Sequence, residues 1–134
     1  MIDASMAVAL IMPDEDAPEA LAVATELAKS RAAAPSLWRL DVANTLIIAE
    51  RRKRITALQR AKGLASLGQL PVEVDEQTSN YAWTRITDLA IELNITAYDA
   101  SYIELAIRKA LPISTLDRDM RRAAKKAGID LLRV

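Results

Sequence analysis

Four aspartates, far apart in the sequence, stand where a carboxylate could take part in chemistry. Asp3 closes a short apolar start, Asp41 lies among apolar residues at helical spacing, Asp99 opens a helical pattern, and Asp117 follows a strand-like run at 113–116. Each acid also has a separate structural explanation, as a helix cap or an ordinary surface residue. Four such explanations at once are less economical than one shared site, which the sequence therefore favours.

A shared acidic site would need a cation. Carboxylates brought into one pocket repel one another and take up protons unless a positive charge neutralises them. Ligand sets made only of oxygen favour Mg²⁺ or Mn²⁺. Such ions activate a water molecule and stabilise the leaving oxygen of a phosphodiester. The chain has no His and no Cys, which excludes imidazole bases, thiol nucleophiles and zinc-finger sites.

Two of the acids stand at predicted helix starts. Residues 95–102 are typical of a turn that leads into a helix, and Thr96 with Asp99 fits a capping box. Asp117 leads from a predicted strand at 113–116 into a helix that ends before Gly128, with Ser114 and Asp117 as a second capping pattern. Local pattern alone leaves capping and catalysis both open for these acids.

Asp41 has an unusual setting. A helix is predicted over 36–48 with Ser36 as its cap, and Leu37, Asp41, Asn44 and Ile48 share one face at spacings of four, three and four. A lone acid among core-facing residues is costly unless something pairs with it, which favours a functional role for Asp41. Four cations at 51–54 then end the helix. Complementarity to the helix dipole explains them, and phosphate binding is the alternative.

The remaining patterns predict a single α/β domain over residues 1–134. A short strand ends at Asp3 and a helical turn follows. Further predictions are a helix from the acids at 14–16 to about residue 33, a helix at 56–70, a strand at 72–74, a long helix from a cap at Asp75 or Thr78 to residue 93, and a last strand at 129–134. Strands separated by helices predict a mostly parallel sheet covered on both faces.

The segments that hold the acids resemble a known family. They are Asp3-Ala4-Ser5, Leu37-Trp38 followed by Asp41-Val42-Ala43-Asn44, Thr96-Ala97-Tyr98-Asp99-Ala100-Ser101-Tyr102, and Ser114-Thr115-Leu116-Asp117. In order and spacing they resemble the PIN-domain ribonucleases, and more specifically the VapC toxins of type II toxin–antitoxin pairs. The resemblance implies a three-layer α/β/α fold, Mg²⁺- or Mn²⁺-dependent endonucleolytic cleavage of RNA, a homodimer, and inhibition by a cognate antitoxin.

The resemblance also implies roles for individual residues. Asp3, Asp99 and Asp117 would hold a first metal ion, and Asp41, where the family usually has Glu, would help to hold a second. Candidate hydrogen-bonding or outer supports are Ser5, Asn44, Thr115 and Asp119. Independently of the resemblance, Arg118, Arg121 and Arg122 are candidate RNA phosphate contacts, and a solvated helix face is the alternative explanation for them.

Composition limits the alternatives. Lys plus Arg equals Asp plus Glu, so nucleic-acid binding must come from local clusters of charge. No apolar run approaches the roughly 20 residues of a membrane span, and a cytoplasmic location is expected. Two other functions remain open: an interaction protein of the same fold without activity, and a nuclease that acts on DNA or in ribosomal RNA processing.

Overall fold

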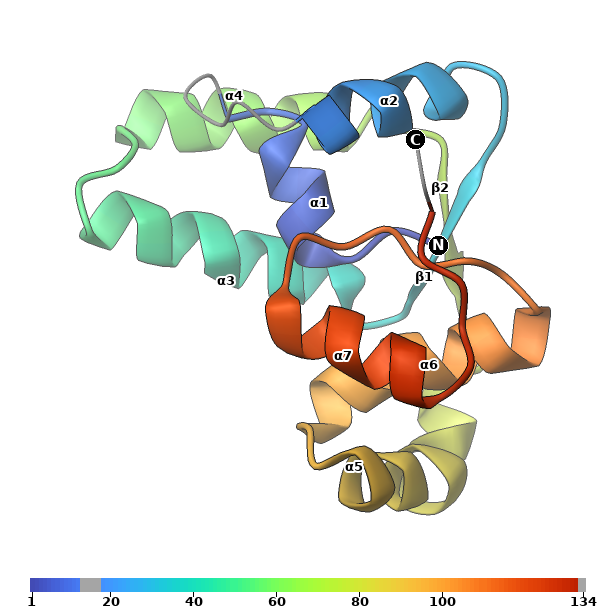
Figure 1. Cartoon of the computed structure of the whole chain (residues 1–134). Coiled ribbons are helices and arrows are strands. Elements are labelled where there is room, and N and C mark those ends of the chain that lie inside the picture. The colour runs from blue at the N-terminus through green and yellow to red at the C-terminus, as the bar shows by residue number, and fades with distance from the viewer. Residues whose placement is uncertain (13–17, 133–134) are drawn as a thin grey trace.

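The chain forms short strands separated by helices in the computed structural model, which describes residues 1–12 and 18–132. Figure 1 shows their arrangement. In chain order the elements are α1 (Ala4–Ala9), α2 (Pro18–Leu27), β1 (Ala32–Pro35), α3 (Trp38–Arg51), α4 (Ala57–Leu67), β2 (Val72–Asp75), the 3-10 turn η1 (Thr78–Tyr81), the π-helical turn η2 (Ala82–Ile86), α5 (Thr87–Leu93), α6 (Ala97–Lys109) and α7 (Arg118–Lys126).

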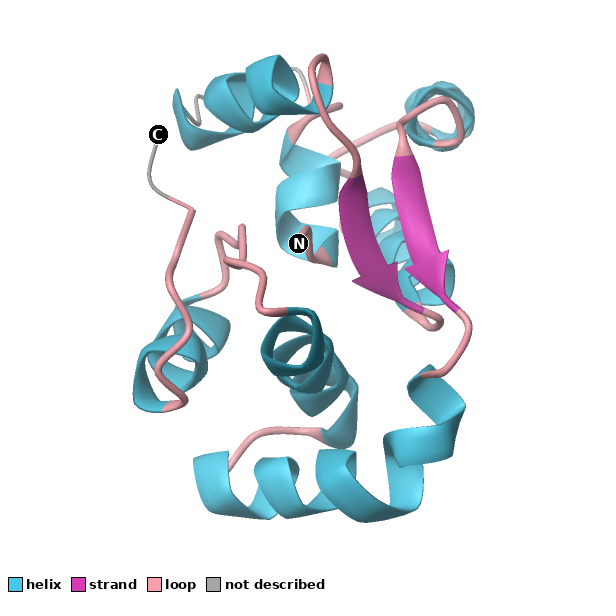
Figure 2. Ribbon diagram, turned by 90° about the vertical axis from the view of Figure 1, so that its right-hand side faces the viewer, coloured by secondary structure: helices cyan, strands magenta, loops and turns pink. Residues whose placement is uncertain are grey.

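The sheet is short and parallel. Strands β1 and β2 pair side by side, with Ala34 opposite Val74 (Figure 2). The Ile2 N–H donates to the Ala33 carbonyl (3.1 Å), and Ile2 forms a parallel bridge with Ser114. A further parallel bridge joins residues 113 and 131. The order across the sheet is therefore β2, β1, residue 2, residues 113–114 and residue 131.

Helices enclose this sheet and build the core. Helix α6 packs against β1, α1 packs against α3, and α5 packs against α6. The most deeply buried large side chains include Ile2, Leu46, Tyr102, Ile103 and Ile113. The predicted α/β fold class, with a short, mostly parallel sheet covered by helices, is confirmed. Among the described residues, no helix is both long and apolar enough to cross a membrane.

The predicted helix up to about residue 33 is wrong in its second half. Helix α2 ends at Leu27, and the alanines that follow form β1. Alanine favours helix, but Ala32 donates to the Pro71 carbonyl (3.0 Å) and Ala34 is fully buried beside β2. Pairing with a distant segment therefore overrides local propensity. The acids at 14–16 lie outside the described residues.

Three other local predictions need correction. Ser36 does not cap α3: its N–H donates to Thr78 Oγ1 (3.0 Å), and the helix begins after Leu37 with no side-chain cap. The predicted long helix is divided into η1, η2 and α5. Neither Asp75 nor Thr78 caps it, because the Thr78 hydroxyl donates to the Asp75 carboxylate (3.1 Å). The predicted strands at 113–116 and 129–134 form single bridges within the described residues.

A buried ionic network fixes α6 to the end of β2. Asp75 and Glu104 are only 7% and 3% exposed, and both accept hydrogen bonds from Arg108, at 2.6 Å and 2.7 Å. The guanidinium also lies over the Tyr81 ring, 4.6 Å from its centroid. Hydrogen bonding to Arg108 lowers the pKa of Asp75. One guanidinium therefore binds two buried carboxylates that belong to different elements.

We predict that Arg108→Met lowers the free energy of unfolding by about 3–5 kcal/mol, because it leaves two buried carboxylates without their cationic partner. Urea denaturation measures the loss. Arg122→Met is the matched control, since Arg122 pairs with Asp119 in solvent and the cost there is under about 1 kcal/mol. Adding Asp75→Asn and Glu104→Gln to Arg108→Met should recover most of the stability. Equal effects of the two single variants would contradict the network's role.

Candidate active site

One cavity of about 250 Å³ is lined by all four aspartates that the sequence singled out. Asp3 precedes α1, Asp41 lies in the first turn of α3, Asp99 lies in the first turn of α6, and Asp117 caps α7. The acids thus come from the starts of four different helices and line one cavity. The other lining residues are Ala4, Ser5, Thr45, Tyr102 and Met120.

Asp3 is the most deeply buried of the four acids, at 4% exposed. Its Oδ1 accepts the Met6 N–H (2.9 Å) and the Ser5 hydroxyl (2.8 Å), and its Oδ2 accepts the Thr115 hydroxyl. Burial raises the pKa of Asp3 to about 6, against the lowering effect of these hydrogen bonds, and the nearby charge of Asp117 raises it further. Asp3 therefore caps α1 and also contributes a carboxylate that is costly to ionise.

The two hydroxyls that hold Asp3 also hold the segment before α7. Thr115 Oγ1 accepts the Asp117 N–H (3.0 Å), and Ser5 Oγ accepts the Leu116 N–H (2.8 Å). Ser5 and Thr115 were both predicted as hydrogen-bonding supports. In the structure they couple the position of Asp3 to that of Asp117 across more than a hundred residues of chain.

Asp41 has a partner that sequence reasoning missed. The Tyr102 hydroxyl donates to Asp41 Oδ2 (2.8 Å), and the tyrosine is 1% exposed. Burial raises the pKa of Tyr102, and the charge of Asp41 adds to the effect, so the phenol stays protonated and serves as a donor. Tyr102 stands three residues after Asp99 on the same helix, a spacing that places both on one face. That spacing was the available signal.

Asp99 and Asp117 complete the cluster. Asp99 is half-buried, and its backbone N–H donates to the Thr96 hydroxyl that caps α6 (3.1 Å). Burial raises the pKa of Asp99 against the lowering effect of a side-chain hydrogen bond with Thr96, and the charges of Asp117, Asp41 and Asp119 raise it as well. Asp117 Oδ1 accepts the Met120 N–H (2.8 Å). The carboxylates therefore act on one another electrostatically across the cavity.

The donor set fits a hard divalent cation in its chemistry. The cavity offers carboxylate and hydroxyl oxygens, which Mg²⁺ and Mn²⁺ prefer. Within residues 1–12 and 18–132, however, no three acidic side chains lie close enough together to form a ready-made metal cluster. Mg²⁺ usually keeps several waters and binds through one or two carboxylates. The site therefore fits an ion held partly through water.

Other predicted site residues lie outside this cavity. Asn44 is exposed on α3, and Asp119 pairs with Arg122 (3.0 Å) and influences Asp99 only through its charge. Arg121 Nε donates to the Thr115 carbonyl (2.9 Å), and its guanidinium lies 3.9 Å from Glu19. The predicted phosphate contacts Arg118, Arg121 and Arg122 are absent from the cavity's described lining. Their role stays a prediction.

Comparison with known proteins identifies the family. The model of the PIN domain matches residues 1–126, and the chain belongs to the PIN-domain family, whose members are generally metal-dependent nucleases. The crystal structure of PAE2754 from Pyrobaculum aerophilum is similar in fold, with a TM-score of 0.61 at 23% identity over 91% of this chain and 82% of that one. No curated protein matches the sequence.

We predict that Asp3→Asn stabilises the protein in metal-free buffer at neutral pH. The pKa of Asp3 is about 6 when folded, against 3.8 as the reference value, so the folded state binds more protons between these values and the free energy of unfolding falls as pH rises through them. Asn does not ionise and so avoids the cost of a buried charge. The free energy of unfolding of the variant, relative to the wild type, should therefore rise from about pH 4 to pH 6 and level off about 2–3 kcal/mol higher.

Urea titrations in EDTA across this pH range measure the effect. Asp88→Asn, at an exposed acid in the first turn of α5, controls for the loss of one negative charge. A difference in the free energy of unfolding between Asp3→Asn and the wild type that stayed constant with pH would show that the pKa of Asp3 is not raised in the folded protein.

Proposed function

We propose that the protein is a metal-dependent endoribonuclease that uses Mg²⁺ or Mn²⁺ at the acidic cavity. The observation that supports it best is the meeting of Asp3, Asp41, Asp99 and Asp117, from four separate segments, in one cavity of about 250 Å³. Asp3, Asp99 and Asp117 would hold the first ion, and Asp41 would help to hold a second. The family membership supports nuclease chemistry in general, and the choice of RNA is part of the proposal.

A bound ion would supply an activated water and positive charge for the oxygens of the scissile phosphodiester. The chain's own residues orient the acids around it. Ser5 and Thr115 fix the direction of the Asp3 carboxylate, and Tyr102 fixes that of Asp41. Burial and neighbouring carboxylates raise the pKa values of Asp3 and Asp99, and a cation in the cavity would favour the ionised forms of both.

We further propose that the protein is the toxin of a toxin–antitoxin pair, with a cognate antitoxin and a second copy of the chain as partners. Large apolar side chains at the surface support protein partners of some kind: Trp83 is 95% exposed, and Leu40, Ile91 and Tyr98 are also exposed. The discriminating observation is a short upstream reading frame that overlaps this one and encodes a DNA-binding segment and an Arg-bearing tail.

We predict that Asp99→Asn abolishes Mn²⁺-dependent cleavage of single-stranded RNA, with a loss of at least about a hundredfold, and leaves folding near normal. The helix cap survives because it uses the backbone N–H of residue 99. Gel assays of labelled RNA measure cleavage, and circular dichroism checks the fold. Asp88→Asn is the control, since Asp88 also lies in the first turn of a helix, α5, but is exposed. Cleavage by Asp99→Asn at the wild-type rate would eliminate the proposed site.

We predict that Tyr102→Phe raises the Mn²⁺ concentration needed for half-maximal activity by about tenfold, because loss of a ligand's supporting hydrogen bond weakens metal sites by this order. The ring and its packing remain, and only the hydrogen bond to Asp41 is lost. Tyr98→Phe, on the same helix but exposed, is the control. If Tyr102→Phe needed the same Mn²⁺ concentration as the wild type, the hydrogen bond from Tyr102 to Asp41 would have no role in metal binding.

Two rival functions have their own tests. A binding protein of the same fold without activity would show no Mn²⁺-linked rise in thermal stability, whereas a metal-binding nuclease gains stability by mass action. A nuclease for DNA would be revealed by competition between single-stranded RNA and DNA of the same sequence.

A further inference from the structure

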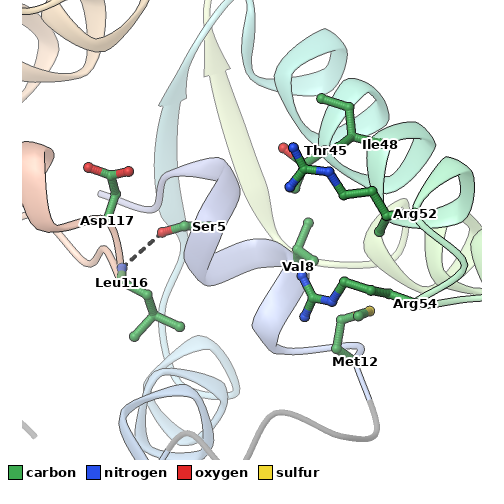
Figure 3. Close-up of a pocket in the computed structure, with 10 residues that line it drawn as sticks. Ser5, Val8, Met12, Thr45, Ile48, Arg52, Arg54, Leu116 and Asp117 are labelled. Carbon is green, nitrogen blue, oxygen red and sulfur yellow. Dashed lines mark hydrogen bonds between the residues drawn. The ribbon is translucent and has the colours of Figure 1, made fainter.

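A second cavity adjoins the acidic one. Its volume is about 360 Å³, and Figure 3 shows the side chains around it. Ser5, Thr45 and Asp117 line both cavities, so the two form neighbouring parts of one depression. The other lining residues are Val8, Met12, Ile48, Ala49, Arg52, Arg54 and Leu116.

The two arginines reach this cavity because of how α3 ends. Arg52 is the C-cap and Lys53 has a positive φ of 58°. The Lys53 N–H donates to the Glu50 carbonyl (2.9 Å) and the Arg54 N–H to the Ala49 carbonyl (2.9 Å), which is the Schellman pattern. The turn folds Arg54 back against the helix. Of the cationic run at 51–54, only residues 52 and 54 line the cavity.

The cavity combines positive charge with an apolar wall. Figure 3 shows the guanidinium groups of Arg52 and Arg54 pointing from the end of α3 toward the side where Ser5 and Asp117 lie. Val8, Met12 and Leu116 supply apolar surface. Within residues 1–12 and 18–132, Arg52 forms no ion pair. A guanidinium beside an acidic cavity, without a carboxylate partner, is available for an external anion.

We propose that Arg52 binds a backbone phosphate of the RNA strand on one side of the scissile linkage, with the adjoining base against the apolar wall. The proposal rests on the proposed nuclease function and assigns one subsite within it. A strand that places one phosphate among carboxylates is repelled there until a cation is bound. A neighbouring phosphate held by arginine, through charge-assisted hydrogen bonds, offsets that repulsion and fixes the strand's register.

The simpler explanation is that Arg52 only complements the negative end of the α3 dipole. Arg51 lies in the last turn of the same helix, is exposed, and stands outside the cavity's lining. A dipole role would be shared by both residues and would affect stability. A phosphate-binding role belongs to Arg52 alone and would affect RNA affinity and its dependence on salt.

The test measures binding of a fluorescent single-stranded RNA of about ten nucleotides by fluorescence anisotropy, in an Asp99→Asn background that prevents cleavage. Arg52→Ala is expected to weaken binding about tenfold and to reduce the slope of log K against log salt by about 0.7, the value for one phosphate contact on a single strand. Arg51→Ala should stay within about twofold of its parent, and Arg52→Lys should recover part of the affinity. If Arg52→Ala and Arg51→Ala changed the RNA affinity and its salt dependence equally, the proposed phosphate subsite would be wrong.

Further arms separate this proposal from the nuclease proposal. If the wild type fails to cleave RNA but binds it in an Arg52-dependent manner, the nuclease function fails and the subsite stands. If the wild type cleaves RNA and Arg52→Ala binds RNA as its parent does, the subsite fails alone. Binding of an oligoglutamate peptide that depends on Arg52, together with RNA binding that does not, would assign the cavity to an acidic protein segment and overturn the proposal.

Discussion

The hydrogen bonding of the Asp3 carboxylate is the constraint on which the site depends. One buried side chain joins the first residues of the chain, the start of α1 and the segment that leads into α7, through Met6, Ser5 and Thr115. Each hydrogen bond lowers the cost of burying the charge, yet the pKa of Asp3 remains raised to about 6 because desolvation dominates. The fold therefore tolerates an acid in a place where ionisation is unfavourable, and it holds that acid in one orientation.

Helix capping and site formation, which stood as alternatives at the level of sequence, are compatible in the structure. Asp3 and Asp117 cap α1 and α7 through one oxygen each and still line the cavity. Asp99 donates its backbone N–H to Thr96 and also shares a side-chain hydrogen bond with that residue, so it takes part in the start of α6 and still lines the cavity. A parallel sheet with helices beginning at one end collects such caps in one region. The capping patterns in the sequence therefore mark where the acids converge and do not argue against a shared site.

Sequence patterns predicted the parts of the fold that local interactions determine. The cap at Thr96, the positive-φ Gly128 and the alternation at 72–74 each correspond to an observed feature. Strand β1 could not be predicted in this way, because its alanines favour helix and only pairing with β2 makes them extended. The gathering of the acids was predicted from the number of acids in such positions and from a resemblance, because no local pattern determines it. The hydrogen bond from Tyr102 to Asp41 joins residues 61 positions apart, so it depends on tertiary packing and could not be predicted locally. The cationic run at 51–54 likewise gave no indication of which of its members would line a cavity.

The distribution of arginines separates two kinds of acid in this protein. Asp75 and Glu104 are paired with Arg108, and the pKa of Asp75 is lowered. In the described part of the chain, the four acids of the cavity have only hydroxyl and N–H donors, and the pKa values of Asp3 and Asp99 are raised. An arginine among them would have satisfied their charge and excluded a metal ion. Arg52 instead lines the adjoining cavity together with Ser5, Thr45 and Asp117, where it can attract an anion and leave the acids available to a cation. Perturbed carboxyls gathered in a cavity without a basic partner are typical of functional sites, whereas neutralised buried acids are typical of structural ones.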